Sequence, residues 1–557
     1  MSGDHVHVAS AALTPELPEA VDIYDTTLRD GSQQEGLSLT VDDKLRVAEQ
    51  LDHLGVQFIE GGWPGANPKD EEFFRRAAAG ELHLHSATLV AFGSTRKAGG
   101  QAGSDPVLRH LLDARTPAVC LVAKAAERHV TETLRTSLTE AIDMVADSVS
   151  WLVGQGRRVF LDAEHFFDGY KANRGFSLDV LRAAEQAGAE VVILCDTNGG
   201  CLPFEVERIV GDVRDTLGAK LGCHFHNDSG CGVANSLVAV RQGVTQVQGC
   251  INGYGERTGN ADLCSAVPGL SLKMGVRTIP AERLERLTPV AHHIAELVNI
   301  APDPHQPYVG ASAFAHKAGL HTSAISRDRD AYEHVAPDGV GNGTRFVVSE
   351  MAGRSTMQLK ATELGLDLSG PVLAEVLEDL KALEHRGYHF EVADGSLELL
   401  MRAATGWKQT YFRLESFRVL TEQREDGAFI TEATIRVHVG DERVLATAEG
   451  NGPVNALDAA LRKAIGSKFP ELAHLHLTDY KVRVLDTSKG TGAVTRVLID
   501  SSDGERTWST IGVSENIIQA SWDALADSIV FGLLHGAAGE GEAVDDIGAA
   551  GGPHRAD

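Results

Sequence analysis

The chain has 557 residues, of which 43% are hydrophobic and 23% are charged. This length predicts two or three domains, and the composition is that of a globular protein. With 51 basic and 78 acidic residues, the net charge of −27 repels the phosphates of nucleic acids and anionic membrane surfaces. We expect no nucleic acid and no membrane as a partner, since no segment approaches the ~20 apolar residues of a membrane span.

The start of the chain predicts a cytoplasmic protein, because no basic stretch followed by an apolar one signals secretion. Seven cysteines without a CxxC pair fit reduced, mostly buried thiols better than disulfides or structural zinc. Residues 1–20 are expected to be disordered. The same holds for residues 536–557, which are rich in glycine, alanine and acidic residues.

Residues 21–285 alternate short apolar runs with helical patterns, which is typical of βαβ units and a parallel sheet. The spacing predicts an α/β fold, a (β/α)8 TIM barrel of ~250 residues, with an open doubly wound sheet as the alternative. The eight runs are Val21 to Tyr24, Gln57 to Glu60, Leu84 to Phe92, Ala118 to Ala123, Arg158 to Asp162, Glu190 to Cys195, Lys220 to Phe225 and Gln246 to Ile251.

The segments between these runs carry the start and stop signals of helices. Thr40 and Asp43 resemble a capping box, apolar residues follow at three-residue steps, and Gly55 ends the pattern. Similar patterns predict helices over residues 178–187 and 233–241.

The alternation stops after about residue 285, and a different organisation follows. Residues 286–404 are predicted to form a helical connector with a Pro-rich segment over 301–307 and a helix over 370–386. Residues 405–535 contain alternating runs such as TEATIRVHVG and KVRVLD and helical patterns over 454–465 and 517–533. This texture predicts a C-terminal α+β domain.

Polar and glycine residues follow most of the predicted strands of the barrel, in the segments DTTLRDG, EGGW, DAEHFFDG, CDTNGG, HFHND and NGYGERTGN. In a barrel, the loops after the strands form the open face that binds ligands. The sequence therefore predicts an active site at this rim.

His224 and His226 lie two residues apart on a predicted strand, so both side chains leave the same face and can bind one ion. Asp30, at the end of the first strand, would complete a set of two imidazoles and a carboxylate that leaves positions open for water and substrate. Magnesium or manganese is favoured as the divalent metal, and zinc or cobalt also suits these ligands. The alternative is a pair of structural histidines.

Arg29 next to Asp30 supplies a permanent cation with a fork of donors, which suits a carboxylate or an oxygen that develops negative charge. A structural pair of Arg29 with Asp30 is the alternative. Glu164 and Thr197, at the ends of the fifth and sixth strands, are candidates for binding the substrate carboxylate or activating its water. Both could instead brace loops.

The segments DTTLRDG, HFHND, GERTGN and AFAHKAGLH together resemble the acyl-CoA-condensing family of 2-isopropylmalate, homocitrate and citramalate synthases. The resemblance covers residues 21–535. The segments IEGGWPGANPKD, LDAEHFFDGYKAN and CDTNGGCLP are most similar to the citramalate synthase branch, which implies condensation of acetyl-CoA with pyruvate in isoleucine biosynthesis.

The resemblance also implies roles for individual residues. Asn260 would lie near or on the metal, with Arg29 as the catalytic arginine. Glu164 and Thr197 would contact metal-bound water or the carboxylate of the 2-oxo acid. His316 and Tyr332 would come from the connector to the barrel mouth, with His316 as the candidate base.

The C-terminal domain resembles the regulatory and dimerisation module of this family, which implies a homodimer and isoleucine as the amino-acid effector. A purely structural dimer domain is the alternative. Other functions remain open: 2-isopropylmalate synthesis, a lyase or aldolase reaction on the same barrel, and a catalytically silent metabolite sensor.

Overall fold

The computed structural model describes residues 16–536, except 318–320, 322–323, 326, 329–330, 347–353, 367, 369, 486–489 and 491. Most of the two predicted disordered ends, 1–20 and 536–557, therefore lies outside the described residues. The chain divides into two compact units, Met1–Phe314 with Glu333–Thr344 and Ala315–Tyr332 with Arg345–Asp557. The expected domain bounds at residues 285 and 404 remain predictions.

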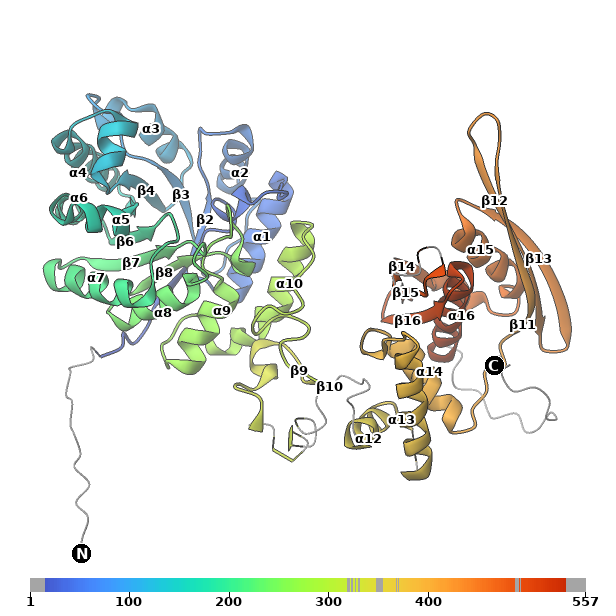
Figure 1. The fold of residues 1–557 in the computed structure, drawn as a ribbon. Helices are drawn as coiled ribbons and strands as arrows, with labels where there is room; N and C mark the ends of the chain where they lie inside the picture. The colour runs from blue at the N-terminus through green and yellow to red at the C-terminus, as the bar shows by residue number, and fades with distance from the viewer. Residues whose placement is uncertain are drawn as a thin grey trace, which may run out of the picture. The chain divides into compact units, whose positions relative to one another are not determined.

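The first unit contains a closed barrel of eight parallel strands, so the predicted (β/α)8 fold is confirmed and the open sheet is wrong (Figure 1). The barrel closes because β1 pairs with both β2 and β8. The strands are β1 (Asp22–Asp25), β2 (Phe58–Gly62), β3 (Thr88–Ser94), β4 (Ala118–Lys124), β5 (Arg158–Glu164), β6 (Val191–Asp196), β7 (Lys220–Phe225) and β8 (Gln246–Gly249).

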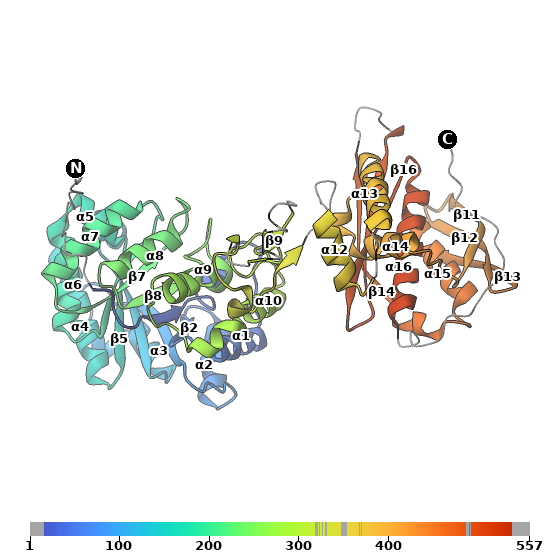
Figure 2. The same cartoon turned by 90° about the horizontal axis from the view of Figure 1, so that it is seen from below.

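Helices cover the outside of the barrel (Figure 2). Large buried side chains, among them Tyr24, Phe58 and Phe160, fill its interior. The helices are α1 (Val41–Leu54), α2 (Pro68–Ala78), α3 (Pro106–Asp113), α4 (Leu138–Gly154), α5 (Phe166–Ala172), α6 (Arg174–Gln186), α7 (Pro203–Thr216), α8 (Gly232–Arg241), α9 (Leu263–Pro268) and α10 (Leu287–Leu297).

Helix α1 begins and ends as its sequence predicts. The Asp43 amide donates to Thr40 Oγ1 at 3.1 Å and the Thr40 amide donates to Asp43 Oδ2 at 2.9 Å, which is the reciprocal capping box. Gly55 adopts a left-handed conformation with φ of 98° and closes the helix.

The third strand begins four residues later than predicted. The amides of His85, Ser86 and Ala87 donate to the carboxylate of Asp52 at 2.7–2.8 Å, so this stretch is a loop anchored on α1. Its apolar pattern suited a strand, but its backbone donors already have a partner on a helix.

The second unit contains two three-stranded antiparallel sheets with helices packed on them and a short two-stranded parallel sheet. This agrees with the α+β organisation that its sequence predicts. The strands are β9 (Ala315–His316), β10 (Arg345–Phe346), β11 (Arg413–Gln423), β12 (Phe429–Val439), β13 (Glu442–Gly450), β14 (His476–Val484), β15 (Thr495–Ser502) and β16 (Thr507–Ser514). The helices are α12 (Arg354–Glu363), α13 (Gly370–His385), α14 (Asp394–Ala404), α15 (Pro453–Ile465) and α16 (Ile517–His535).

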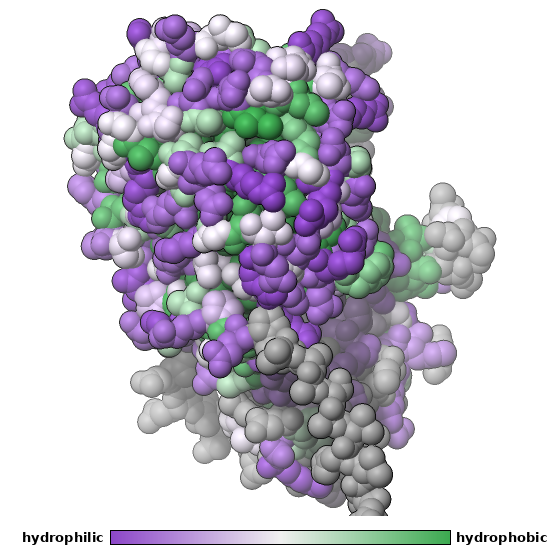
Figure 3. Space-filling model, turned by 90° about the vertical axis from the view of Figure 1, so that its left-hand side faces the viewer, coloured by the Kyte–Doolittle hydropathy of each residue, from purple (hydrophilic) through white to green (hydrophobic). Residues whose placement is uncertain are grey.

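Helix α16 is long and apolar enough to cross a membrane, although the sequence was predicted to contain no such segment. Its most apolar stretch of 18 residues is 61% buried inside the protein. Residues such as Trp522, Leu525 and Ile529 belong to the core of the second unit. The outer surface shown in Figure 3 is mostly hydrophilic, with apolar side chains scattered over it.

Candidate active site

The polar residues predicted at the strand ends converge at one rim of the barrel. Arg29 and Asp30 follow β1, Glu164 ends β5 and Thr197 follows β6. His224 lies in β7 and His226 follows it. All of them line a single cavity of about 140 Å³, called here the rim cavity. Its other lining residues are Gln33, Phe92, Val122, Asp162, Cys195, Glu256 and Arg257.

Asp30, His224 and His226 form a compact, buried cluster. Asp30 Oδ2 lies 3.1 Å from His224 Nε2 and 3.7 Å from His226 Nε2, and the two Nε2 atoms lie 3.3 Å apart. One ligand atom from each residue lies within 4.8 Å of the others, which suits a shared metal ion. The structure thus brings Asp30 together with two histidines that lie about 200 positions later in the sequence.

Asn260 lies beside His226, and its side-chain oxygen is a further candidate ligand. Its backbone bridges to that of His226, and its side chain is 1% exposed. Its Nδ2 donates to the carbonyl of Tyr254 at 3.0 Å, whereas among the described residues its buried Oδ1 has no hydrogen-bond partner. A buried acceptor without a donor is rare and is relieved by a cation, so these residues fit a divalent metal.

The charges within the cluster support each other. Burial raises the pKa of Asp30, but the charge of Arg29 and the hydrogen bond from His224 outweigh burial and hold that pKa well below its usual value. Burial and the neighbouring His224 lower the pKa of His226 to about 4. Asp30 is thus an anion and His226 a neutral imidazole at neutral pH, which are the states that bind metal.

Arg29 is held in one orientation on three sides. Its Nε donates to the fully buried carboxylate of Glu60 in β2, and its guanidinium lies over the ring of Phe92, 3.9 Å from the ring centroid. Its Nη1 lies 3.4 Å from Asp30 Oδ2. Tyr24 donates to the second oxygen of Glu60 at 2.5 Å, which fixes this carboxylate in turn.

Glu164 and Thr197 have protein partners as well as a place in the cavity. Glu164 forms an ion pair with Lys124 of β4, and Thr197 Oγ1 accepts a hydrogen bond from the amide of His165 at 2.8 Å. The cavity therefore has both oxygens and cations on its wall.

His316 and Tyr332 belong to the second compact unit, His316 in β9 and Tyr332 in a turn with its ring stacked on His321. Tyr332 is 48% exposed. Their expected place over the barrel mouth remains a prediction.

A second cavity, of about 530 Å³, shares Arg257 with the first, and Asn260 lies on its wall. Its wall carries side-chain amides from Gln34, Asn227 and Gln306. The loop from Asn252 to Asn260 forms much of it. Gly259 is required in this loop, because its φ is 89° and a Cβ there would lie 1.9 Å from the carbonyl oxygen of Gly253.

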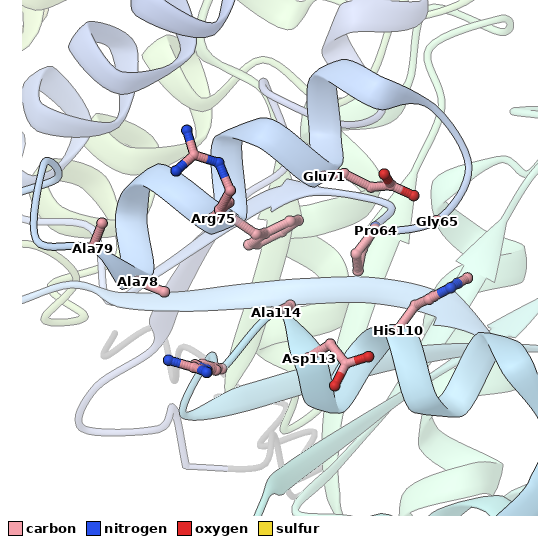
Figure 4. A pocket seen from close by; sticks show the side chains of 11 residues that line it. Pro64, Gly65, Glu71, Arg75, Ala78, Ala79, His110, Asp113 and Ala114 are labelled. Carbon is pink, nitrogen blue, oxygen red and sulfur yellow. The ribbon is translucent and has the colours of Figure 1, made fainter.

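A third cavity, of about 510 Å³ and called here the outer cavity, lies on the outside of the barrel between α2 and α3 (Figure 4). Glu71 and Arg75 of α2 and His110 and Asp113 of α3 border it. Its lining differs from that of the rim cavity.

Some residues that shape the site were missed in the sequence. Glu60 and Asp162 were passed over although each lies near the end of a predicted strand, and Gln248 lies inside β8. A charged or amide side chain in an otherwise apolar, buried strand was the available signal, since such groups are rarely buried without a partner.

Fold and site together define a metal-dependent barrel of the HMGL-like class, and the family model with that description matches residues 20–287. A model described as homocitrate synthase post-HMGL domain-like matches residues 308–388, and one for the LeuA allosteric (dimerisation) domain matches residues 391–532.

The chain is 54% identical to an (R)-citramalate synthase of Streptomyces coelicolor, over 94% of this chain and 98% of the relative. It is 50% identical to an (R)-citramalate synthase of Synechocystis, over 92% and 96% of the two chains. A probable 2-isopropylmalate synthase of Methanopyrus kandleri is 32% identical over 92% and 98%. The chain belongs to the (R)-citramalate synthase family.

Proposed function

We propose that the protein condenses acetyl-CoA with pyruvate and water to (R)-citramalate and free CoA. The observation that carries this proposal is the convergence of Asp30, His224 and His226 beside Arg29 in a cavity of about 140 Å³. Relatives named for this reaction, at 54% and 50% identity over nearly the whole chain, support it.

Asp30, His224, His226 and Asn260 would hold the divalent metal, with magnesium or manganese favoured and zinc or cobalt also suited. When bound, the metal would polarise the ketone of the 2-oxo acid as a Lewis acid. The protein fixes this ligand set from three different strands or the loops that follow them.

Arg29 would stabilise the ketone oxygen as it becomes negative, because it lines the cavity and its orientation is fixed in advance by Glu60 and Phe92. Thr197 and Glu164 would bind the substrate carboxylate or its water. His316 would remove a methyl proton from acetyl-CoA and Tyr332 would assist at the barrel mouth.

Acetyl-CoA is too large for the rim cavity, whose volume equals about five waters of the liquid at ≈ 30 Å³ each. We place its thioester arm in the adjoining cavity of about 530 Å³. The amides that line this cavity match the two amides of the pantetheine arm.

The small rim cavity favours a three-carbon 2-oxo acid. Synthesis of 2-isopropylmalate from 2-oxoisovalerate is the second candidate, and the relatives named for it, at 32% and 30% identity, support it less. A lyase or aldolase reaction would require the same barrel but not the match to an allosteric domain.

The first test is an assay of free thiol release. The chain is incubated with acetyl-CoA, Mn²⁺ and one of four acceptors, pyruvate, 2-oxobutyrate, 2-oxoisovalerate or 2-oxoglutarate. We expect the highest kcat/KM with pyruvate and (R)-citramalate on chiral chromatography. A higher value with 2-oxoisovalerate would assign the second candidate, and thiol release without any acceptor would indicate a hydrolase.

A pair of histidine variants serves as the control for this assay. His224→Ala removes a proposed ligand and is expected to abolish condensation. His110→Ala changes an exposed histidine at the outer cavity and should retain it.

We further propose that residues 21–285 form the catalytic domain, 286–404 a connector and 405–535 a regulatory and dimerisation domain of a cytoplasmic homodimer. The match to an allosteric (dimerisation) domain supports this assignment. Isoleucine, the end product of the pathway, would be the effector.

A further inference from the structure

Gln248 is a fully buried glutamine in β8 that contacts a proposed metal ligand. Its Oε1 lies 2.9 Å from His224 Nδ1, and its Nε2 donates to Asp162 Oδ1 of β5 at 3.0 Å. Asp162, Gln248 and His224 thus form a continuous hydrogen-bonded chain that starts inside the barrel and ends beside Asp30 at the rim.

The partner of the Gln248 nitrogen determines which way its amide faces. A carboxylate oxygen accepts hydrogen bonds and an amide NH2 only donates, so the nitrogen Nε2 of Gln248 must face Asp162. The amide oxygen must then face His224. Because that oxygen only accepts, His224 Nδ1 carries the proton.

The other ring nitrogen of His224 is the one that faces the cluster. In the metal-free cluster Nε2 carries a proton toward Asp30 Oδ2, 3.1 Å away, and a metal would displace that proton. The ring that keeps its proton on Nδ1 then presents the lone pair of Nε2, which also lies 3.3 Å from His226 Nε2. Electron pairs from three residues then converge on one point, as a cation requires.

We propose that Gln248 is a positioning residue that, oriented by Asp162, fixes the Nδ1–H tautomer and the ring orientation of His224 for metal binding. The inference rests on the proposed metal site. Outer partners of metal-bound histidines typically contribute 10–100-fold to metal affinity, so the loss of Gln248 should weaken binding by that factor.

The test measures Mn²⁺ affinity by the EPR signal of free Mn²⁺, which requires no turnover. Gln248→Met keeps the length of the side chain and removes both hydrogen bonds, and we expect a Kd about 10–100-fold higher. The matched control is Gln246→Met, on the same face of the same strand, where no described residue bonds the amide. We expect its Kd to stay within twofold.

A double variant tests orientation separately from packing. In Gln248→Glu with Asp162→Asn, the asparagine amide donates to the new carboxylate, whose other oxygen still accepts from His224. We expect the Kd to return to within about threefold of the parent. A double variant that binds as weakly as Gln248→Met, or a Gln248→Met variant that binds like the parent, would overturn the proposal.

His224→Ala separates this inference from the metal site itself. If His224→Ala weakens Mn²⁺ binding and Gln248→Met does not, the positioning role is wrong while the metal site stands. If His224→Ala leaves the Kd unchanged, the metal site is wrong, and the role of Gln248 is wrong with it.

Discussion

At the scale of single residues, Arg29 shows how the site depends on shape as well as charge. Its guanidinium contacts a buried carboxylate, an aromatic face and Asp30 at once. A lysine carries the same charge on a flexible stem but cannot make these contacts together.

We therefore predict that Arg29→Lys lowers kcat about 100- to 1000-fold, the range found when a donor to a developing oxyanion is removed. The Kd for Mn²⁺ should change little. Steady-state kinetics with pyruvate and acetyl-CoA provide the measurement, and EPR titration the control. Full activity of the lysine variant would show that charge alone suffices.

The residues of the cluster were predictable because each stands where a strand ends. Asp30, His224 and His226 lie near or just after the ends of apolar runs, and strand ends share one rim in a parallel barrel. Gln248 and Asp162 could not be paired from sequence. Their contact exists only because closure of the barrel brings the interior faces of β5 and β8 together.

At the scale of an element, α16 carries an acidic group in its buried face. Asp527 accepts a hydrogen bond from Ser396 of α14 at 2.7 Å. Burial, with a smaller contribution from the charge of Asp523, raises its pKa to about 7. An ionised Asp527 is thus unfavourable where α14 packs on α16.

The direction of the pH effect follows from linkage. Because the folded pKa lies above the unfolded value of 3.8, the folded state holds the proton longer, and stability falls as the pH rises from about 4 through 7. The shift corresponds to roughly 4 kcal/mol at 1.36 kcal/mol per pKa unit.

We predict that Asp527→Asn, which stays neutral and can still accept from Ser396, makes the second unit more stable than the parent at pH 8.5. The difference should shrink towards pH 6. Calorimetric unfolding at several pH values measures it. A difference that does not vary with pH would contradict the assignment to this titration.

Most helices and strands could be predicted from the sequence, because the apolar residues of strands and helices recur with different periods and capping residues mark the helix ends. The helices α13, α15 and α16 lie within a few residues of their expected bounds. The start of β3 could not be predicted, because the amides of residues 85–87 donate to the carboxylate of Asp52, which lies far away in the sequence on α1.

At the scale of the whole molecule, the two compact units have separate hydrophobic cores. A ligand that binds one unit stabilises that unit by mass action, by about 2.7 kcal/mol at one hundred times its Kd. The two proposed ligands, a divalent metal and isoleucine, should therefore act on different unfolding transitions.

We predict two calorimetric transitions for the full chain. Mn²⁺ should raise the Tm of the barrel transition, and isoleucine that of the second unit. Valine serves as the control amino acid. A shift of the same transition by both ligands would contradict the separate placement of the two sites.

The sequence could not show on which sheet the helices α12, α13 and α14 pack. The apolar faces of α12, α13 and α14 share a core with Ile511 and Val513 of β16. An amphipathic pattern marks the buried face of a helix but not the sheet that covers it.

The segment Glu333–Thr344 belongs to the first unit although Ala315–Tyr332, before it, belongs to the second. It is held there by Thr288, which donates to the carbonyl of Val340 at 2.7 Å, and by Asn342, which donates to that of Tyr308 at 2.8 Å. The polypeptide therefore passes between the units three times. A protease that cleaves only at the first passage, between Phe314 and Ala315, would leave two fragments that stay associated. The C-terminal fragment would still bind the barrel unit through Glu333–Thr344.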